Sequence, residues 1–114
     1  MCDTPNRFDT LLNLCRNVRR RIILGAFVGR TEPATLTDLE QVILEHDQHA
    51  SSEQERTIRI ALIHKHVPKL EAAALLEYDS DRRLVTPTST FERWQPQIST
   101  ILEADPTLET PIRF

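Results

Sequence analysis

Apolar side chains recur at steps of three and four residues along most of the chain, which predicts a mostly α-helical protein. The first apolar face is formed by Phe8, Leu11, Leu12 and Cys15. Asn17 offers an N-cap for a second helix, because its side chain can accept hydrogen bonds from the first free backbone amides. This second helix is expected to end near Gly25 to Gly29, the segment that holds both glycines of the chain.

A third helix of about three turns is predicted after Pro33. Thr37 and Glu40 stand at the spacing of a capping box, and Thr35 is a competing N-cap. The apolar face of this helix consists of Leu36, Leu39, Val42 and Ile43. The polar stretch 46–51 then breaks the pattern, and Ser52 with Glu55 forms a second capping box. We therefore expect a loop between the third helix and a long fourth one.

The long fourth segment is predicted to bury one face made of Ile60, Ile63, Val67, Leu70 and Ala74. Pro68 interrupts this helix, and a kink is expected near Val67, because proline lacks a backbone donor and crowds the preceding turn. Ile63 and Leu70 should be buried. The same periodicity turns Arg56 and Arg59 toward the core side, and the alternative is that the extra N-terminal turn projects beyond the core.

A β-hairpin and a last helix follow. Residues 76–79 and 83–86 alternate apolar with polar side chains around the turn-forming stretch 80–82. Ser89 and Glu92 give a third capping box, and the helix that it opens should end before Asp105. The apolar stripe of this helix is Trp94, Ile98, Ile101 and Leu102.

The second, third and fourth helices, the hairpin and the trailing helix give the element order of a winged helix-turn-helix with an additional C-terminal helix. With 114 residues the chain is expected to form one domain: a flexible N-terminus at 1–7, the winged-helix domain at 8–104 and a tail at 105–114. A trailing amphipathic helix is a common dimerisation element, so Trp94, Ile98 and Leu102 are predicted at a homodimer interface, with Phe8 and Leu12 beside them. The alternative is that this stripe folds back on its own core.

The end of the long helix resembles the recognition helix of ArsR-like and MarR-like proteins, whose pattern is "HL, two residues, L, two residues, AGL". Four elements match it: His66-Val67, Leu70, Ala73 and Leu75. Ala74 replaces the usual glycine at the helix end.

The chain from Phe8 to about Val85 is also similar to a haloarchaeal family of small winged-helix proteins of unassigned function. The residues that carry this similarity are Phe8-Asp9, Leu11-Leu12, Asn17, Arg19-Arg20-Arg21, Leu24 and the run 56–78 with its core His66-Val67-Pro68-Lys69-Leu70. The resemblance implies an archaeal regulator of transcription.

The net charge of −3 argues against a uniformly basic DNA-binding surface, but the charge is segregated along the chain. Five arginines and no acid lie between Arg16 and Arg30. The apolar stretches are too short to cross a membrane, no secretion signal is present, and two cysteines do not indicate a disulfide framework. A cytoplasmic protein is expected.

Double-stranded DNA is the predicted partner, and the predicted contact residues come from three places. They are Arg20 on the second helix, Thr57, His64, Lys65 and Lys69 on the long helix, and Arg82 and Arg83 at the hairpin tip. Arginine and lysine suit phosphates, whereas His64 and Lys65 could contact base edges in the major groove. The alternative for each basic group is an exposed helix face or hairpin tip that binds nothing.

Metal binding and catalysis find little support in the sequence. The histidines at 46, 49, 64 and 66 do not form a helical pair four apart, and no paired cysteine motif is present, so neither a metal site nor a cofactor is expected. No glycine-rich phosphate loop or nucleophile elbow occurs, so the chain is not expected to be an enzyme. The leading hypothesis is a dimeric DNA-binding transcriptional regulator, and the alternative is a winged-helix module that binds another protein without DNA affinity. The distribution of Asp79, Asp81 and Glu71 among the basic residues should distinguish the two.

Overall fold

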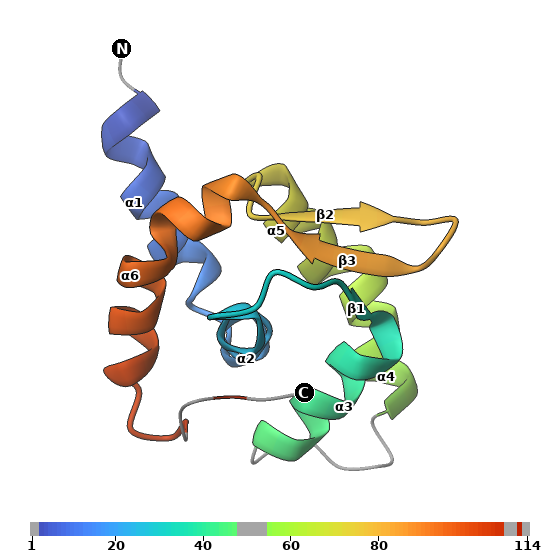
Figure 1. Ribbon diagram of the computed structural model, residues 1–114. Coiled ribbons are helices and arrows are strands. Elements are labelled where there is room, and N and C mark those ends of the chain that lie inside the picture. The colour runs from blue at the N-terminus through green and yellow to red at the C-terminus, as the bar shows by residue number, and fades with distance from the viewer. Residues whose placement is uncertain (1–2, 48–54, 109–111, 113–114) are drawn as a thin grey trace.

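A computed structural model describes residues 3–47, 55–108 and 112 of the chain. The elements in this part run in the order α1 (Asp3–Leu14), α2 (Val18–Phe27), β1 (Ala34–Thr35), α3 (Leu36–His46), α4 (Glu55–Ala61), η2 (Leu62–His66), α5 (Val67–Ala72), β2 (Leu76–Asp79), β3 (Leu84–Pro87) and α6 (Ser89–Glu103) (Figure 1). Helix α1 begins within the segment predicted to be a flexible N-terminus.

The hairpin β2–β3 and the short strand β1 form a small antiparallel sheet in the order β1-β3-β2. Val85 of β3 pairs with Tyr78 of β2 on one side and with Ala34 of β1 on the other. The hairpin follows the continuous helix α4–η2–α5, which packs on α3, and it extends away from α1 and α6 (Figure 1). This is the arrangement of a winged helix-turn-helix with an additional C-terminal helix, as the sequence predicts. Strand β1 was not predicted, because two residues are too few to show an alternating pattern.

Three helix starts are held by side-chain caps. The Asn17 side chain accepts hydrogen bonds from the amides of Arg19, at 2.9 Å, and Arg20, at 3.4 Å, which confirms this cap. Helix α3 starts at the competing cap: Thr35 and Asp38 form the capping box, in place of the predicted pair at 37 and 40. Helix α6 is capped by Thr88, one residue before the predicted Ser89. The capping box predicted at Ser52 lies outside the described residues.

The long helix contains one π turn, η2, where the Val67 amide donates to the Leu62 carbonyl. Pro68 has no N–H and its ring would crowd the preceding turn of a regular α-helix, so a wider turn accommodates it. The extra residue in this turn rotates the side chains of α4 about the helix axis relative to those of α5. The residues that line the buried face are Ile58, Leu62, His66, Val67 and Leu70. Leu70 is buried as predicted, but the prediction for Ile60 and Ile63 is wrong: they are 51% and 37% exposed.

Helix α2 lies at the centre of the core, and its residues 22–27 are all buried. Phe27 meets Phe91 of α6 edge to face, with ring centroids 6.4 Å apart. Ile98 and Leu102 of α6 are also buried within this same chain. They cannot be the exposed surface of a dimer interface, so the fold-back alternative is correct for these two residues.

The segment after α6 also contributes to the core. Leu108 and Ile112 are buried, so the prediction of a loose tail at 105–114 is wrong for both. Ile112 packs over Gly25, and a side chain at position 25 would overlap the Ile112 side chain. Among the described residues, no helix combines the length and the apolar character that crossing a membrane requires.

Candidate nucleic-acid interface

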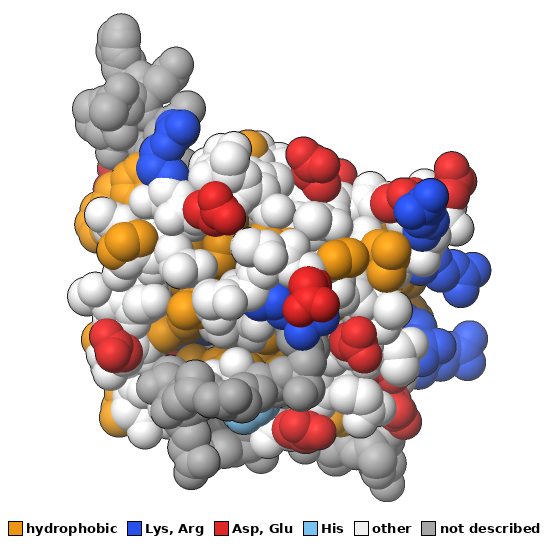
Figure 2. Space-filling view, viewed as in Figure 1, with side chains coloured by type: hydrophobic (Ala, Val, Ile, Leu, Met, Phe, Trp, Pro, Cys, Tyr) orange, Lys and Arg blue, Asp and Glu red, His pale blue; other side chains and the backbone are white. Residues whose placement is uncertain are grey.

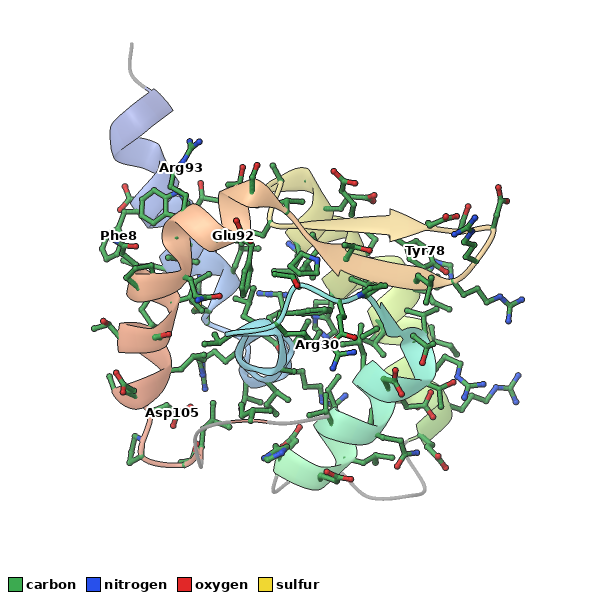
Figure 3. The ribbon with its side chains drawn as sticks, viewed as in Figure 1. Phe8, Arg30, Tyr78, Glu92, Arg93 and Asp105 are labelled. Atoms are coloured by element: carbon green, nitrogen blue, oxygen red, sulfur yellow. The ribbon has the colours of Figure 1, made fainter. Side chains whose placement is uncertain are left out.

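A groove with a volume of about 510 Å³ separates the hairpin from the start of α3 and from the long helix. It is lined by Thr35, Leu36, Thr37, Arg59, Ile63, Tyr78, Arg82 and Arg83. Tyr78 marks its hairpin wall in Figure 3. Three arginines from two elements that are far apart in sequence therefore share one concave surface.

Arg59 is anchored in this groove by a buried acid. Its Nε donates to Glu40 Oε2 at 2.7 Å and its Nη2 to Oε1 at 3.3 Å, an arrangement that matches the planar guanidinium to the carboxylate. Glu40 is 1% exposed, whereas 54% of the Arg59 side chain remains accessible. The hydrogen bonds that Arg59 donates to Glu40 raise the pKa of Arg59, which keeps its charge fixed.

The sequence did not identify Arg59 as a site residue, because the predicted helix face turned it toward the core. One signal was available. Ile58 and Leu62 are four residues apart and compete with Ile60 and Ile63 for the buried face, and Pro68 lies where the register changes.

Arg82 and Arg83 are exposed at the hairpin turn, as predicted. Asp79 organises this turn: its Oδ1 accepts hydrogen bonds from the amides of Asp81, at 3.0 Å, and Arg82, at 3.2 Å. Its other oxygen lies 4.0 Å from Arg82 Nε, an exposed pair of little energetic weight. Arg83 adopts a φ of 56°, the left-handed conformation that tight turns often require.

The other predicted residues of the long helix are exposed but do not line the groove. Thr57, His64, Lys65 and Lys69 lie along its solvent side. Glu71 lies near the C-terminal end of the same helix. Its Oε2 accepts a hydrogen bond from the Tyr78 amide at 3.2 Å. Figure 2 shows Lys and Arg side chains gathered at the edge of the molecule near the hairpin tip and α4, with Asp and Glu side chains among them.

Arg20 is buried, at 7% exposure, so the expectation that it faces a phosphate is wrong. Helix α2 is surrounded by other elements, and the side opposite Ile22 therefore faces protein and not water. Arg20 Nε donates to the Leu14 carbonyl at 2.7 Å, and its Nη1 lies 3.4 Å from His66 Nδ1.

The neighbours of Arg20 are also engaged within the chain. Arg19 pairs with Asp47, and Arg21 pairs with Asp105, each at 3.0 Å. The run of three arginines thus stabilises the fold, and the basic groove lies elsewhere.

The described residues contain no group of three or more His, Cys, Asp or Glu side chains placed to hold a metal ion. Cys15 is buried beside α2, and this burial raises the pKa of its thiol. His49 lies outside the described part of the chain.

The fold and the groove together define a winged-helix protein with a basic surface between its wing and its long helix. The chain belongs to the family described as "Domain of unknown function (DUF7344)", whose model matches residues 12–86. The match runs from the last turn of α1 into the second strand of the hairpin and includes every residue that lines the groove. Neither a curated protein nor a solved structure matches the sequence. The haloarchaeal, ArsR-like and MarR-like resemblances stay predictions.

Proposed function

We propose that this protein binds double-stranded DNA as a homodimer and regulates transcription, acting by binding and not by catalysis. The observation that carries the proposal is the convergence of Arg59, Arg82 and Arg83 on one groove beside the exposed side of the long helix. Guanidinium groups bind phosphate oxygens with two donors, and a groove concentrates their field.

The net charge of −3 does not oppose this proposal, because a phosphate responds to the local charge of the surface that it meets. Arg19 and Arg21 are paired with acids inside the chain, and Arg59 is paired with Glu40. Arg82, Arg83 and Lys69 are assigned to backbone phosphates, and the accessible part of the Arg59 side chain lies beside Arg82 and Arg83 in the groove. His64 and Lys65 are assigned to base edges, and Thr57 is small enough to permit close approach.

The proposed dimer uses α1 in place of the buried residues of α6. Phe8 and Leu12 are one helical turn apart and are 44% and 42% exposed, and Trp94 of α6 is half-buried. Such paired exposed apolar side chains are typical of a contact surface. Sedimentation at micromolar concentration tests the dimer, and Phe8→Ser plus Leu12→Ser should shift it to a monomer.

The DNA proposal is tested by titrating a mixed-sequence duplex at several salt concentrations. Each phosphate contact contributes a log-log slope of about −0.9, so Arg82→Ala plus Arg83→Ala should weaken binding to all duplexes and flatten the slope by about 2 per subunit. Arg16→Ala plus Arg93→Ala is the matched control, since it removes the same charge from exposed positions outside the groove. Figure 3 shows Arg93 on α6, far across the view from Tyr78. Lys65→Ala should instead change the preference among sequences.

Absence of any association at low salt would overturn the DNA proposal and favour the second candidate, a protein-interaction module. One observation supports that candidate: Ile60 and Ile63 are exposed on the same helix as the basic residues. A protein partner should then lose affinity for Ile60→Ser plus Ile63→Ser, whereas the arginine variants should have the smaller effect.

A further inference from the structure

A second cavity, of about 320 Å³, lies at the C-terminal end of the long helix and shares no lining residue with the basic groove. It is bounded by α1, by the turn that joins α5 to β2, and by the first half of α6. The lining residues are Thr10, Leu11, Leu14, Ala72, Ala73, Ala74, Leu75, Thr90 and Trp94. Figure 1 shows α1 and α6 side by side, with the start of α6 next to the end of α5. The proposed function places one of these residues, Trp94, at the dimer surface, but neither it nor the family match gives the cavity itself a role.

The chemistry of the cavity favours neutral ligands. None of its lining residues carries a charged side chain, so a charged ligand would lose hydration there without gaining an ion-pair partner. The backbone at the helix end is already satisfied, because the amides of Ala73, Ala74 and Leu75 donate to the carbonyls of Lys69, Glu71 and Leu70. The polar groups that remain for a ligand are side chains: the Thr90 hydroxyl and the Trp94 indole N–H donate no hydrogen bond to the described residues.

We infer that this cavity binds a small, neutral, aromatic molecule. A dry apolar cavity of about 150 Å³ already holds benzene, and small-molecule sites begin at about 300 Å³, so one or two rings fit. The indole of Trp94 offers a stacking surface. The three successive alanines 72–74 also line the cavity, and their short side chains leave space for a ring.

An occupant of this cavity would contact the last turn of the long helix, whose exposed side carries the proposed DNA contacts. Ligand and DNA then influence each other reciprocally, because both bias the position of one helix. This coupling rests on the proposed function, whereas binding to the cavity does not.

Trp94 is the only tryptophan of the chain, so its fluorescence reports directly on the cavity. The probe is benzyl alcohol, compared with benzoate and benzylammonium, which have the same ring and opposite charges. Benzyl alcohol should shift the Trp94 emission to shorter wavelength in a saturable titration, with a Kd on the order of 1 mM for so small a ligand. The two charged analogues should bind at least about tenfold more weakly, because the cavity offers them no partner.

Two variants fill the cavity from opposite walls, Ala72→Met from α5 and Thr90→Met from α6. Each should weaken benzyl alcohol binding at least about fivefold by occupying its volume. Ala104→Met is the matched control at an exposed position outside the cavity and should leave the titration unchanged. The inference is overturned if the titration does not saturate, if the charged analogues bind equally well, or if both filled variants bind as tightly as the parent chain.

The coupling is measured separately, as the DNA affinity with and without saturating benzyl alcohol. An unchanged affinity in the parent chain would overturn the coupling. A chain that binds benzyl alcohol but no DNA would overturn the proposed function and leave the cavity as a ligand site.

Discussion

Arg20 and His66 meet inside the protein, with Arg20 Nη1 3.4 Å from His66 Nδ1 and both side chains buried. Arginine can only donate, so Nδ1 accepts, and the proton of the neutral imidazole is on Nε2. Burial, followed by the charge of the Arg20 guanidinium, lowers the pKa of His66 to about 4. The end of α1, helix α2 and the long helix are thereby joined through one arginine, which also donates to the Leu14 carbonyl.

The first prediction concerns pH. The pKa of His66 is depressed on folding, so the unfolded chain takes up the proton first, and stability should be fully present above about pH 6.5. As pH falls from about 6.5 to about 4, this group should reduce the free energy of unfolding by up to about 3 kcal/mol. Asp105, whose pKa is also lowered, chiefly by a hydrogen bond from Thr107, loses its contribution only at more acidic pH. Urea unfolding across this range measures the slope.

His66→Asn isolates this effect, because its amide oxygen can still accept from Arg20 but does not titrate. The variant should flatten the pH dependence between about pH 6.5 and about pH 4. Thr57→Asn, on the exposed side of the same helix, removes no titratable group and should leave the dependence as it is. A parent slope that survives His66→Asn would show that another group is responsible.

The second prediction tests the register of the long helix. Leu62 is fully buried, so Leu62→Ala should lower the free energy of unfolding by about 2 to 5 kcal/mol. Ile63→Ala, at the adjacent but 37% exposed position, should cost less than about 1 kcal/mol. Equal losses, or a larger loss at Ile63, would contradict the π turn at residues 62–66.

The third prediction concerns the end of α5, where Ala74 has a φ of 63°. A left-handed conformation costs a non-glycine residue about 1 to 2 kcal/mol, whereas glycine gives up about 0.5 to 1 kcal/mol of chain entropy. Ala74→Gly should therefore raise the free energy of unfolding by about 0.5 to 1 kcal/mol. Ala61→Gly is the control, since Ala61 has a right-handed helical φ of −65° and the same change should be destabilising there. Chemical denaturation midpoints decide whether the two signs differ.

The fourth prediction concerns the contact between α2 and the C-terminal segment. A Cβ on Gly25 would lie 2.7 Å from Ile112 Cδ1 and 3.2 Å from Leu102 Cδ1. Gly25→Ala should cost about 1 to 3 kcal/mol through this overlap. Ile112→Val removes the Cδ1 atom, so the same substitution in that background should cost at least about 1 kcal/mol less. Additive effects in the double variant would show that Ile112 does not pack over Gly25.

Local features were determined by the sequence alone. The Asn17 cap, the end of α2 before Gly29 and the hairpin depend on residues within a few positions of one another. All three are found as the pattern predicts, except that the second strand of the hairpin starts one residue later, at Leu84. Arg82 and Arg83, which line the groove from the hairpin, were identified for the same reason, because the side chains of a hairpin turn are exposed to solvent.

Tertiary packing decided the remaining features. The apolar stripe of α6 could cover either its own core or a partner, and the choice depends on whether the apolar side chains of α2 lie against it. In the folded chain α2 packs against α6, and Ile98 and Leu102 are buried. Arg20 is buried because other elements surround α2, although it lies in a run of three arginines. Arg59 enters the groove because one π turn before Pro68 rotates α4 relative to α5. Periodicity assumes a regular helix in contact with one surface, and a widened turn or a helix packed on all sides breaks that assumption.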